Sequence, residues 1–264
     1  MQIISVINQK GGVGKTTTVI NLAAGLIKKS KRVLVIDLDP QGNATTGLGL
    51  SNLDNSRSTI YGVLNGAKSL DEVIKKTQFE NLDLITSNVD LSGLEVETAA
   101  DSKRAFILKD QLESFLKDYG TKYDYIFIDC PPSLSLLTVM ALVASYSLVV
   151  PLQTEFFALE GVTQLIKTIE RIKNNLNPDL LIRGILLTMY DKRNKLSGQV
   201  EKEARDYFKE KVYQTVVPRN VRLSEAPSHG MPVLFYDKSC PGSKSYFNFT
   251  DEFINQEKIM ESAA

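Results

Sequence analysis

Residues 3–18 read IISVINQKGGVGKTTT, and this stretch decides the fold. The mostly apolar residues 3–7 are typical of a buried β-strand, and the apolar spacing after the glycines predicts a helix over 16–29. A glycine-rich turn lies between the two. A strand, a glycine-rich turn and a helix in this order are the elements of a phosphate-binding loop.

The residues of the turn suit a phosphate chemically. The small glycines Gly11, Gly12 and Gly14 let successive backbone N–H groups point at one anion. The helix that follows directs its positive N-terminal end at the same place. Lys15 can reach the β- and γ-phosphates, and the Thr16 hydroxyl is placed to ligate Mg²⁺. The sequence therefore predicts a nucleotide phosphate site.

The turn differs from the standard motif G-x-x-x-x-G-K-[ST] at its start. Gln9 stands where that motif has its first glycine, and an additional lysine, Lys10, follows it. A second cation near a developing phosphate charge lowers the barrier to hydrolysis as an arginine finger does. From the residues alone, a Lys10 that simply faces solvent is almost as plausible.

The composition of the chain excludes several kinds of protein. The chain has 264 residues, of which 43% are hydrophobic and 23% charged, as in an ordinary globular protein with a sizeable core. Its net charge of zero excludes a protein that coats nucleic acid through overall charge. Two cysteines exclude a disulfide framework, and no apolar run reaches the roughly 18 residues of a membrane span. We expect a soluble cytoplasmic protein with a single domain over 1–264.

Short apolar runs alternate with longer helical segments along the chain. This alternation predicts an α/β fold, a mostly parallel sheet with helices on both faces, whose ligand lies beyond the carboxyl ends of the strands. Segment 49–81 is expected to be a loop with short helices, and a last helix is expected from about residue 245. The expected strands are 3–7, 33–37, 82–85, 125–129, 147–151 and 182–188. The expected helices are 16–29, 103–118, 134–144, 159–175 and 195–210. Five aromatic residues are expected in or beside core elements: Tyr123, Tyr125, Phe127, Phe156 and Phe157.

Carboxylates end two of the expected strands. Residues 33–39 read VLVIDLD and end in Asp37 and Asp39, and residues 125–129 read YIFID and end in Asp129. A carboxylate that ends an apolar strand beside a phosphate loop can hold the Mg²⁺ shell, often through water. Asp39 lies beyond the strand end, where it could position the attacking water. Caps of ordinary loops are the alternative for these residues.

Four segments together resemble the ParA/Soj chromosome-partitioning ATPases. They are KGGVGKTTT at 10–18, DLDPQGNA at 37–44, IDCPPS at 128–133 and PRNVRLSEAPS at 218–228. The resemblance runs from about residue 2 to 250. The first segment alone indicates only the wider deviant Walker group of P-loop proteins, which includes MinD and the nitrogenase iron protein, whereas the later segments are more specific.

The resemblance implies roles for individual residues. Lys10 matches the signature lysine that contacts the phosphates of the partner subunit in a nucleotide-sandwich dimer. Lys15 matches the Walker lysine, and Asp39 matches the carboxylate needed for hydrolysis. Thr16 and Asp129 match the Mg²⁺ shell, and the segment around Pro218 resembles the one that packs on the adenine. The implied nucleotide-binding residues are Lys10, Gly11, Gly12, Val13, Gly14, Lys15, Thr16, Thr17 and Pro218.

The resemblance also implies partners. ATP-bound dimers of this family bind double-stranded DNA without sequence preference, and a ParB-type centromere-binding protein stimulates hydrolysis and releases them. The protein would then be associated with the nucleoid. Residues 183–244 carry 12 Lys or Arg against seven Asp or Glu, although a solvated helix face would explain much of this excess. Arg193 and Arg222 match DNA-contacting positions of Soj-like proteins, and Lys244 is a weaker candidate.

Two other functions compete with partitioning. A MinD-like, membrane-associated spatial regulator needs a basic amphipathic C-terminal helix. Residues 249–264 instead carry four acidic residues against Lys258 alone, which anionic lipid would repel. A metabolic enzyme on the same fold, such as an ATP-dependent ligase or amidase, would need catalytic residues for a second substrate, and the sequence offers no obvious set.

Overall fold

An eight-stranded sheet runs through the molecule in the order β3-β4-β2-β5-β1-β6-β7-β8. The computed structural model describes residues 1–50, 56–120 and 122–262. Neighbouring strands are parallel except for β3, which pairs antiparallel with β4 at one edge. The α/β fold with a mostly parallel sheet is therefore confirmed. The strands are β1 (Gln2–Val6), β2 (Val33–Asp37), β3 (Ile74–Lys76), β4 (Leu82–Ile85), β5 (Tyr125–Asp129), β6 (Ser147–Gln153), β7 (Leu181–Tyr190) and β8 (Val212–Pro218).

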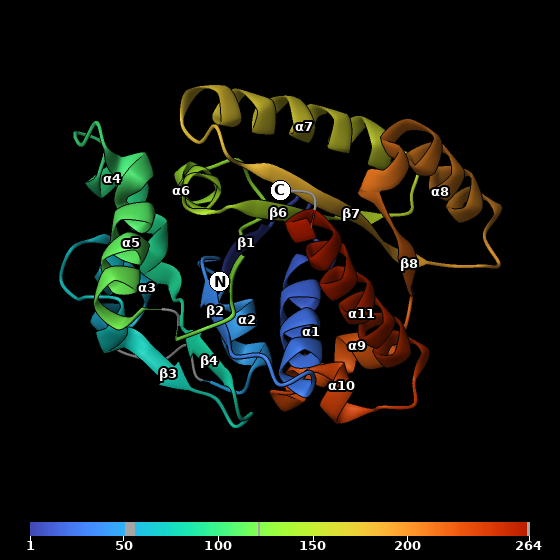
Figure 1. Ribbon diagram of the computed structural model, residues 1–264, viewed down its shortest axis with the longest axis horizontal. Coiled ribbons are helices and arrows are strands. Elements are labelled where there is room, and N and C mark those ends of the chain that lie inside the picture. The colour runs from blue at the N-terminus through green and yellow to red at the C-terminus, as the bar shows by residue number, and fades with distance from the viewer. Residues whose placement is uncertain (51–55, 121, 263–264) are drawn as a thin grey trace.

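Helices cover both faces of the sheet (Figure 1). The central strands β2, β4 and β5 are buried along their whole length, which explains why their sequences are apolar runs rather than alternating patterns. One face packs against α1 (Lys15–Lys28), α2 (Asn43–Gly47), α9 (Val221–Glu225), α10 (Val233–Tyr236) and α11 (Pro241–Ser262). The other face packs against α3 (Ile60–Leu64), α4 (Leu94–Glu97), α5 (Ile107–Tyr119), α6 (Leu136–Ala144), α7 (Ala158–Asn175) and α8 (Lys195–Phe208).

The sequence predicted the central elements and missed two at the edges of the sheet. Segment 49–81 contains the edge strand β3 as well as short helices, and its residues 51–55 lie outside the described part. Strand β8 was also missed, because polar residues interrupt its apolar pattern and it lies at the edge of the sheet, where it pairs with β7. The last helix begins at Pro241, four residues before the expected start. No helix in the described ranges is long and apolar enough to cross a bilayer.

The aromatic prediction is wrong for two of its five residues. Tyr123, Tyr125 and Phe127 are buried as expected. Phe156 and Phe157, by contrast, are 72% and 69% exposed, and their ring centroids lie 5.0 Å apart. Both lie in the turn between β6 and α7, at the edge where the strands end, so neither helical layer covers them.

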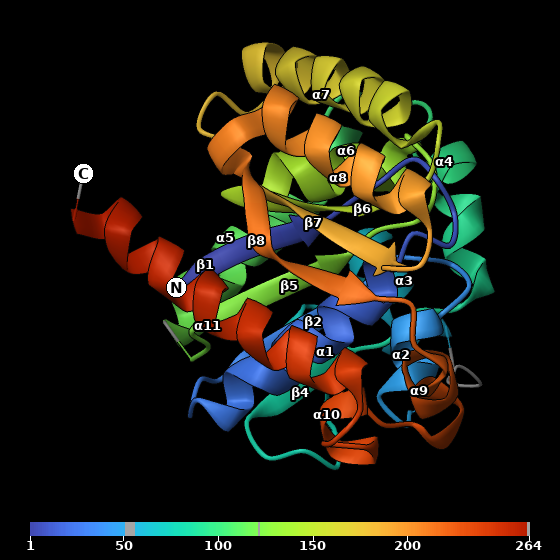
Figure 2. The ribbon, with the colours of Figure 1, turned by 90° about the vertical axis from the view of Figure 1, so that its right-hand side faces the viewer.

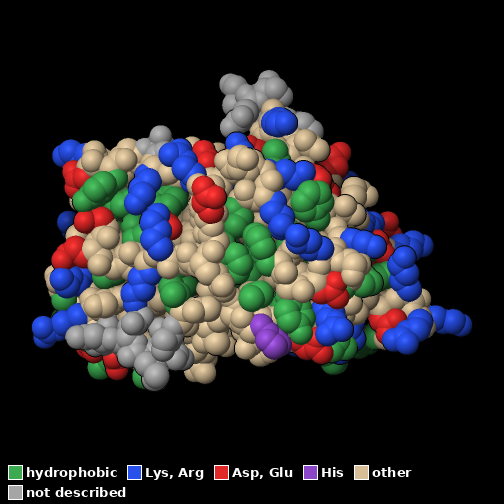
Figure 3. Space-filling view, turned by 90° about the horizontal axis from the view of Figure 1, so that it is seen from below, with side chains coloured by type: hydrophobic (Ala, Val, Ile, Leu, Met, Phe, Trp, Pro, Cys, Tyr) green, Lys and Arg blue, Asp and Glu red, His purple; other side chains and the backbone are tan. Residues whose placement is uncertain are grey.

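The surface on the α10 side carries Lys and Arg side chains next to hydrophobic ones (Figure 3).

Helices α1 and α11 lie side by side on one face of the sheet (Figures 1 and 2). Gly25 of α1 is the point of close approach, because a Cβ atom built there would lie 2.0 Å from the Thr250 hydroxyl oxygen of α11. The two helices can pack at this distance only if position 25 has no side chain.

We therefore expect Gly25→Ala to destabilise the protein by about 1–3 kcal/mol, because the methyl group forces α1 and α11 apart. Chemical unfolding measures this loss. Gly161→Ala in α7 is the matched control, since a Cβ there meets nothing within 4 Å. The control is expected to be neutral or stabilising by up to about 1 kcal/mol, as alanine favours helix over glycine. Equal stability of the two variants would contradict the close packing.

Candidate nucleotide-binding site

Three neighbouring strands deliver the predicted site residues to one edge of the sheet. The register pairs Val6 of β1 with Asp129 of β5, and Asp129 with Asp37 of β2. The two carboxylates therefore lie next to each other at the strand ends. The glycine-rich loop leaves β1 immediately after Val6, on the other side of Asp129. Residues far apart in the sequence thus meet through strand pairing alone.

The glycine-rich loop requires glycine at two positions. Gly12 and Gly14 have φ angles of +75° and +91°, in the left-handed region that other residues avoid. Gly14 is also the N-cap of α1, so the N-terminal end of α1 opens at the loop. The Thr188 hydroxyl donates to the Val13 carbonyl at 2.9 Å and ties the loop to β7. The loop is therefore held in a conformation in which backbone N–H groups can bind an anion.

Lys15 lies inside this loop. Its Nζ donates to the Lys10 carbonyl oxygen at 3.1 Å, and the residue is only 6% exposed. Burial lowers the pKa of Lys15, and the nearby charge of Asp129 opposes this shift. A phosphate in the loop would bring a negative charge to the buried ammonium.

Asp129 carries an unsatisfied acceptor. The Thr16 hydroxyl donates to its Oδ2 at 2.7 Å, whereas its Oδ1 is buried without a hydrogen-bond partner among the described residues. Burial, and then the neighbouring Asp37, raise the pKa of Asp129 well above the ordinary aspartate value. A buried oxygen without a donor, next to a hydroxyl and a second carboxylate, is the chemistry of a hard divalent cation site.

Asp37 has a structural role that the sequence did not reveal. Its Oδ2 accepts from the backbone N–H and the hydroxyl of Thr45, both at 2.7 Å, and thereby fixes α2 to the end of β2. Its Oδ1 accepts from the Asp39 N–H at 3.2 Å. Complete burial raises the pKa of Asp37 to about 6, against the effect of these hydrogen bonds. Asp37 thus shapes the turn that carries Asp39.

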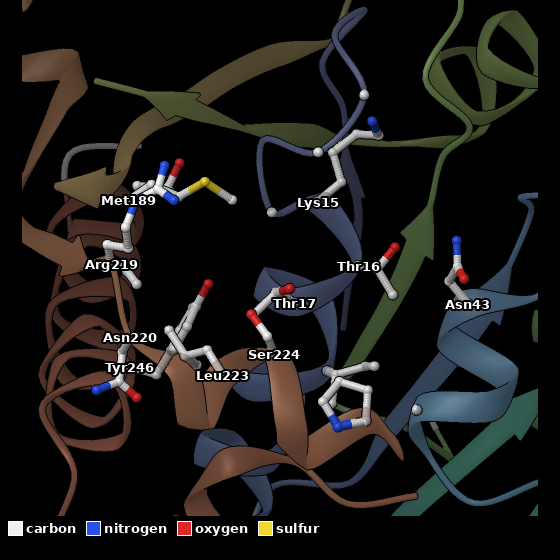
Figure 4. A pocket seen from close by; sticks show the side chains of 18 of the residues that line it. Lys15, Thr16, Thr17, Asn43, Met189, Arg219, Asn220, Leu223, Ser224 and Tyr246 are labelled. Atoms are coloured by element: carbon white, nitrogen blue, oxygen red, sulfur yellow. The ribbon is translucent and has the colours of Figure 1, made fainter. Parts of the chain in front are cut away.

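A cavity of about 540 Å³ opens beside the loop (Figure 4). Asp39 lines it and is 6% exposed, with its Oδ1 accepting from the Gln41 N–H at 3.0 Å. Lys15, Thr16 and Thr17 line the end next to α1, and Figure 4 shows Asn220, Leu223 and Tyr246 at the other end. The cavity therefore runs from the phosphate loop to a partly apolar wall.

The missed strand β8 builds that far wall. Because β8 is parallel to β7, it also ends at the ligand edge of the sheet, and it places Pro218 and Asn220 in the cavity lining. The Asn220 Oδ1 is buried and has no hydrogen-bond partner within the described ranges. An acceptor of this kind beside the Pro218 and Leu223 side chains suits an aromatic base that carries an amino group.

Lys10 and Val13 do not line the cavity, although both belong to the loop. Val13 is buried in the protein. Lys10 forms an ion pair with Glu155, and its side chain is 54% exposed. The structure therefore separates the two loop lysines, with one beside the cavity and the other at the surface.

The three predicted DNA residues lie outside this cavity. Arg193, between β7 and α8, forms an ion pair with Asp191 at 3.0 Å. Arg222, in α9, pairs with Glu225 at 2.7 Å and lies 3.6 Å from Asp237. Lys244 in α11 lines a second, smaller pocket and forms none of the ion pairs among the described residues. The two arginines are thus already paired with acidic side chains.

Comparison with known proteins identifies the family. A family model described as an AAA domain matches residues 1–182. The chromosome partitioning protein ParA of Caulobacter vibrioides is 50% identical over 100% of this chain and 98% of its own length. The sporulation initiation inhibitor protein Soj of Bacillus subtilis is 49% identical over 95% and 97% of the two chains. The chain belongs to the ParA/Soj family of chromosome-partitioning ATPases.

Solved structures also match this chain over most of its length. Cobyrinic acid a,c-diamide synthase from Mycobacterium smegmatis, crystallised with an ATP analogue and magnesium, is 34% identical. It superposes with a TM-score of 0.83 over 98% of this chain and 96% of that chain. The fold therefore extends to enzymes outside chromosome partitioning, and the fold alone does not distinguish them.

The buried carboxylates predict a pH dependence of stability. Between pH 5.5 and 7.5 the folded protein loses a proton from Asp37, whose pKa is raised to about 6, while the unfolded chain has already lost it at its ordinary value of 3.8. Raising the pH over this range should therefore lower the free energy of unfolding of the nucleotide-free protein by about 1 kcal/mol. The raised pKa of Asp129 acts in the same direction.

Urea unfolding at the two pH values measures this change. Asp37→Asn is the control, because it removes one of the two titrating carboxyl groups and should make the free energy of unfolding depend less steeply on pH. A wild-type protein that is equally stable or more stable at pH 7.5 than at pH 5.5 would contradict the assignment of Asp37 as a buried carboxyl group with a raised pKa.

Proposed function

We propose that this partitioning ATPase binds Mg²⁺–ATP in the cavity beside the glycine-rich loop and acts as an ATP-dependent dimer on DNA. The observation that carries the proposal is the orientation of the two loop lysines. Lys15 faces the cavity, whereas Lys10 lies outside it at the surface. This arrangement suits a site that supplies one cation itself and offers the other to a second subunit.

The residues at the loop fit the phosphates and the metal. Backbone N–H groups of Gly11 to Thr17 and the Lys15 ammonium would hold the β- and γ-phosphates. Thr16 and Asp129 would hold Mg²⁺, because Asp129 has a buried oxygen without a donor in the described part of the chain. When bound, the cation would neutralise charge on the phosphate oxygens. Asp39, held by the Gln41 N–H, would orient the water for attack.

The far wall of the cavity would bind the base. Pro218 would pack on one face of an adenine ring, and the Asn220 Oδ1 would accept from its exocyclic amino group. That acceptor is buried and unpaired within the described ranges, so a base with a donor at this place would satisfy it. A guanine would place a carbonyl oxygen there and leave the acceptor unsatisfied.

The dimer would bind duplex DNA without sequence preference, and a ParB-type partner would stimulate hydrolysis and thereby release it. Identity of 50% to ParA, against 34% to the diamide synthase, supports partitioning over a ligase reaction. Acidic residues such as Asp251 and Glu252 in the last helix weigh against the MinD-like membrane regulator, since anionic lipid would repel them. Nucleoid association would follow from DNA binding.

DNA binding is tested first with Asp39→Ala, which should bind ATP without hydrolysing it. We expect this variant to bind random-sequence duplex DNA with Mg²⁺–ATP but not with ADP. Its affinity for DNA should fall steeply as the salt concentration rises, because the contacts go to phosphates. Fluorescence anisotropy across a salt series measures the nucleotide dependence and the salt dependence of binding. Absence of binding in either nucleotide state would reject the DNA step.

Mixing two inactive variants tests whether Lys10 acts across the dimer. Lys10→Ala and Asp39→Ala should each lack ATPase activity alone. In a mixed dimer, the subunit that carries Lys10→Ala keeps its own Asp39 and receives Lys10 from its partner, so mixing should restore part of the wild-type rate. Phosphate release measures the recovery.

The matched control replaces Asp39→Ala with the double variant Lys10→Ala/Asp39→Ala. That partner supplies no lysine, so its mixture should stay inactive. Recovery in the control mixture, or none in the first mixture, would contradict action in trans.

A further inference from the structure

Tyr246 brings the last helix of the chain into the nucleotide cavity. It belongs to α11, yet its side chain lines the same cavity as Lys15 and Thr17. The residue is 1% exposed, so the cavity is the place where its hydroxyl could meet a ligand. None of the residues that the family resemblance assigns to the nucleotide lies in this helix.

Close packing fixes α11 against the far wall of the cavity. Gly242 and Tyr246 are four residues apart and therefore lie on the same face of α11. A Cβ atom at position 242 would lie 2.7 Å from the Leu223 Cγ and 3.3 Å from the Asn220 Oδ1. The place of Tyr246 thus follows from helix packing against two residues that line the cavity.

The Tyr246 hydroxyl has a proton to donate. Its oxygen lies 3.1 Å from the Thr18 Oγ1, and within the described residues this is the one hydrogen bond that either hydroxyl forms. Two hydroxyls carry two protons, so one proton has no acceptor in that part of the chain. Thr18 is completely buried, whereas Tyr246 reaches the cavity. The arrangement that suits both is a Thr18 hydroxyl that donates to Tyr246 and a phenol proton that is directed into the cavity.

The phenol keeps this proton. Burial raises the pKa of Tyr246, and the Thr18 hydrogen bond opposes the shift only in part. A neutral phenol beside a cavity is a hydrogen-bond donor without an acceptor until a ligand supplies one. A buried donor in that state costs free energy, so a ligand oxygen at this place would be stabilised.

The Tyr246 hydroxyl lies between the two ends of the cavity. Its partner Thr18 is in the first turn of α1, directly after Thr17, which lines the cavity at the loop end. Figure 4 shows the Tyr246 hydroxyl pointing away from Asn220, the residue at the other end. In a nucleotide the sugar joins the phosphates to the base. A donor between the phosphate loop and Asn220 therefore faces the sugar.

We propose that Tyr246 donates a hydrogen bond from its phenol to a ribose hydroxyl oxygen of the bound nucleotide, which makes α11 part of the nucleotide-binding site. The assignment rests on the nucleotide binding proposed above and deepens it, because it names the residue that recognises the sugar. A ribose hydroxyl suits this place, since it accepts from the phenol and can donate in turn. A nucleotide that lacks this hydroxyl would leave the phenol proton without an acceptor.

The test compares Tyr246→Phe with Tyr213→Phe by calorimetric titration with Mg²⁺ and ADP, 2′-deoxy-ADP or 3′-deoxy-ADP. With ADP, neither hydrolysis nor ATP-dependent dimerisation contributes to the measured affinity. Tyr246→Phe removes the hydroxyl and keeps the ring. Tyr213 is the matched control, because it is also buried and its hydroxyl donates to Gln256 of α11 at 3.0 Å, outside the cavity lining. Urea unfolding verifies that both variants are folded.

We expect the wild-type protein to bind one of the two deoxy analogues about three- to tenfold more weakly than ADP, which corresponds to one lost hydrogen bond. Tyr246→Phe should bind ADP more weakly by the same factor and bind that analogue as the wild type does, so that the discrimination disappears. Tyr213→Phe should keep the affinity for ADP and the discrimination within about twofold of the wild type, since its hydroxyl lies away from the ligand.

The other outcomes overturn the proposal and can be told apart. A wild-type protein that binds ADP and both analogues equally makes no hydrogen bond to a sugar hydroxyl. A Tyr246→Phe variant that keeps the discrimination leaves the contact to another residue. Equal weakening for ADP and both analogues would mean that Tyr246 acts on the base, on the phosphates or through the packing of α11. If the wild-type protein binds no Mg²⁺–ADP, the proposed nucleotide site itself fails and this assignment fails with it.

Discussion

Parallel pairing of β2, β5 and β1 is the constraint on which the rest of the site depends. The register places Asp37 and Asp129 side by side at the strand ends, with the glycine-rich loop next to them. Each carboxylate is buried, so their mutual repulsion is poorly screened and raises the pKa of Asp129 further. The folded protein tolerates the repulsion between the two carboxylates because the Thr45 hydroxyl donates a hydrogen bond to Asp37 and the Thr16 hydroxyl donates one to Asp129. Within the described residues these donors leave one Asp129 oxygen unsatisfied, and that oxygen is the one a cation would bind.

The same edge of the sheet explains why Lys15 is buried beside the cavity and Lys10 is exposed. Lys15 is the first residue of α1, and its ammonium group donates a hydrogen bond to the Lys10 carbonyl oxygen in the loop. Lys10 precedes the glycines, in the bend that follows β1, and its side chain forms an ion pair with Glu155 beyond the end of β6. The exposed rings of Phe156 and Phe157 follow Glu155 directly. A lysine held at a surface with exposed aromatic rings suits an edge that a second subunit covers.

The central sheet and the phosphate loop could be predicted from the sequence because their signals are local. An apolar strand that ends in aspartate or in a glycine-rich turn can be recognised in the sequence without knowledge of its neighbours. Strand β8 could not be recognised in this way, since it is an edge strand whose pattern includes Gln214 and Thr215. Its omission left the place of Pro218 to the family resemblance, whereas the parallel pairing with β7 explains it physically. The exposure of Phe156 and Phe157 depends on where the helical layers end, which no local pattern contains.

Charge was the property that the sequence described least well. Counting Lys and Arg over 183–244 gave a basic segment, but the count does not show which cations are neutralised in the fold. Arg193 and Arg222 lie inside that segment and are paired with acids. A neutral protein can attract a polyanion only where tertiary structure separates cations from acids. This separation is a property of the fold, so a count along the sequence does not locate it.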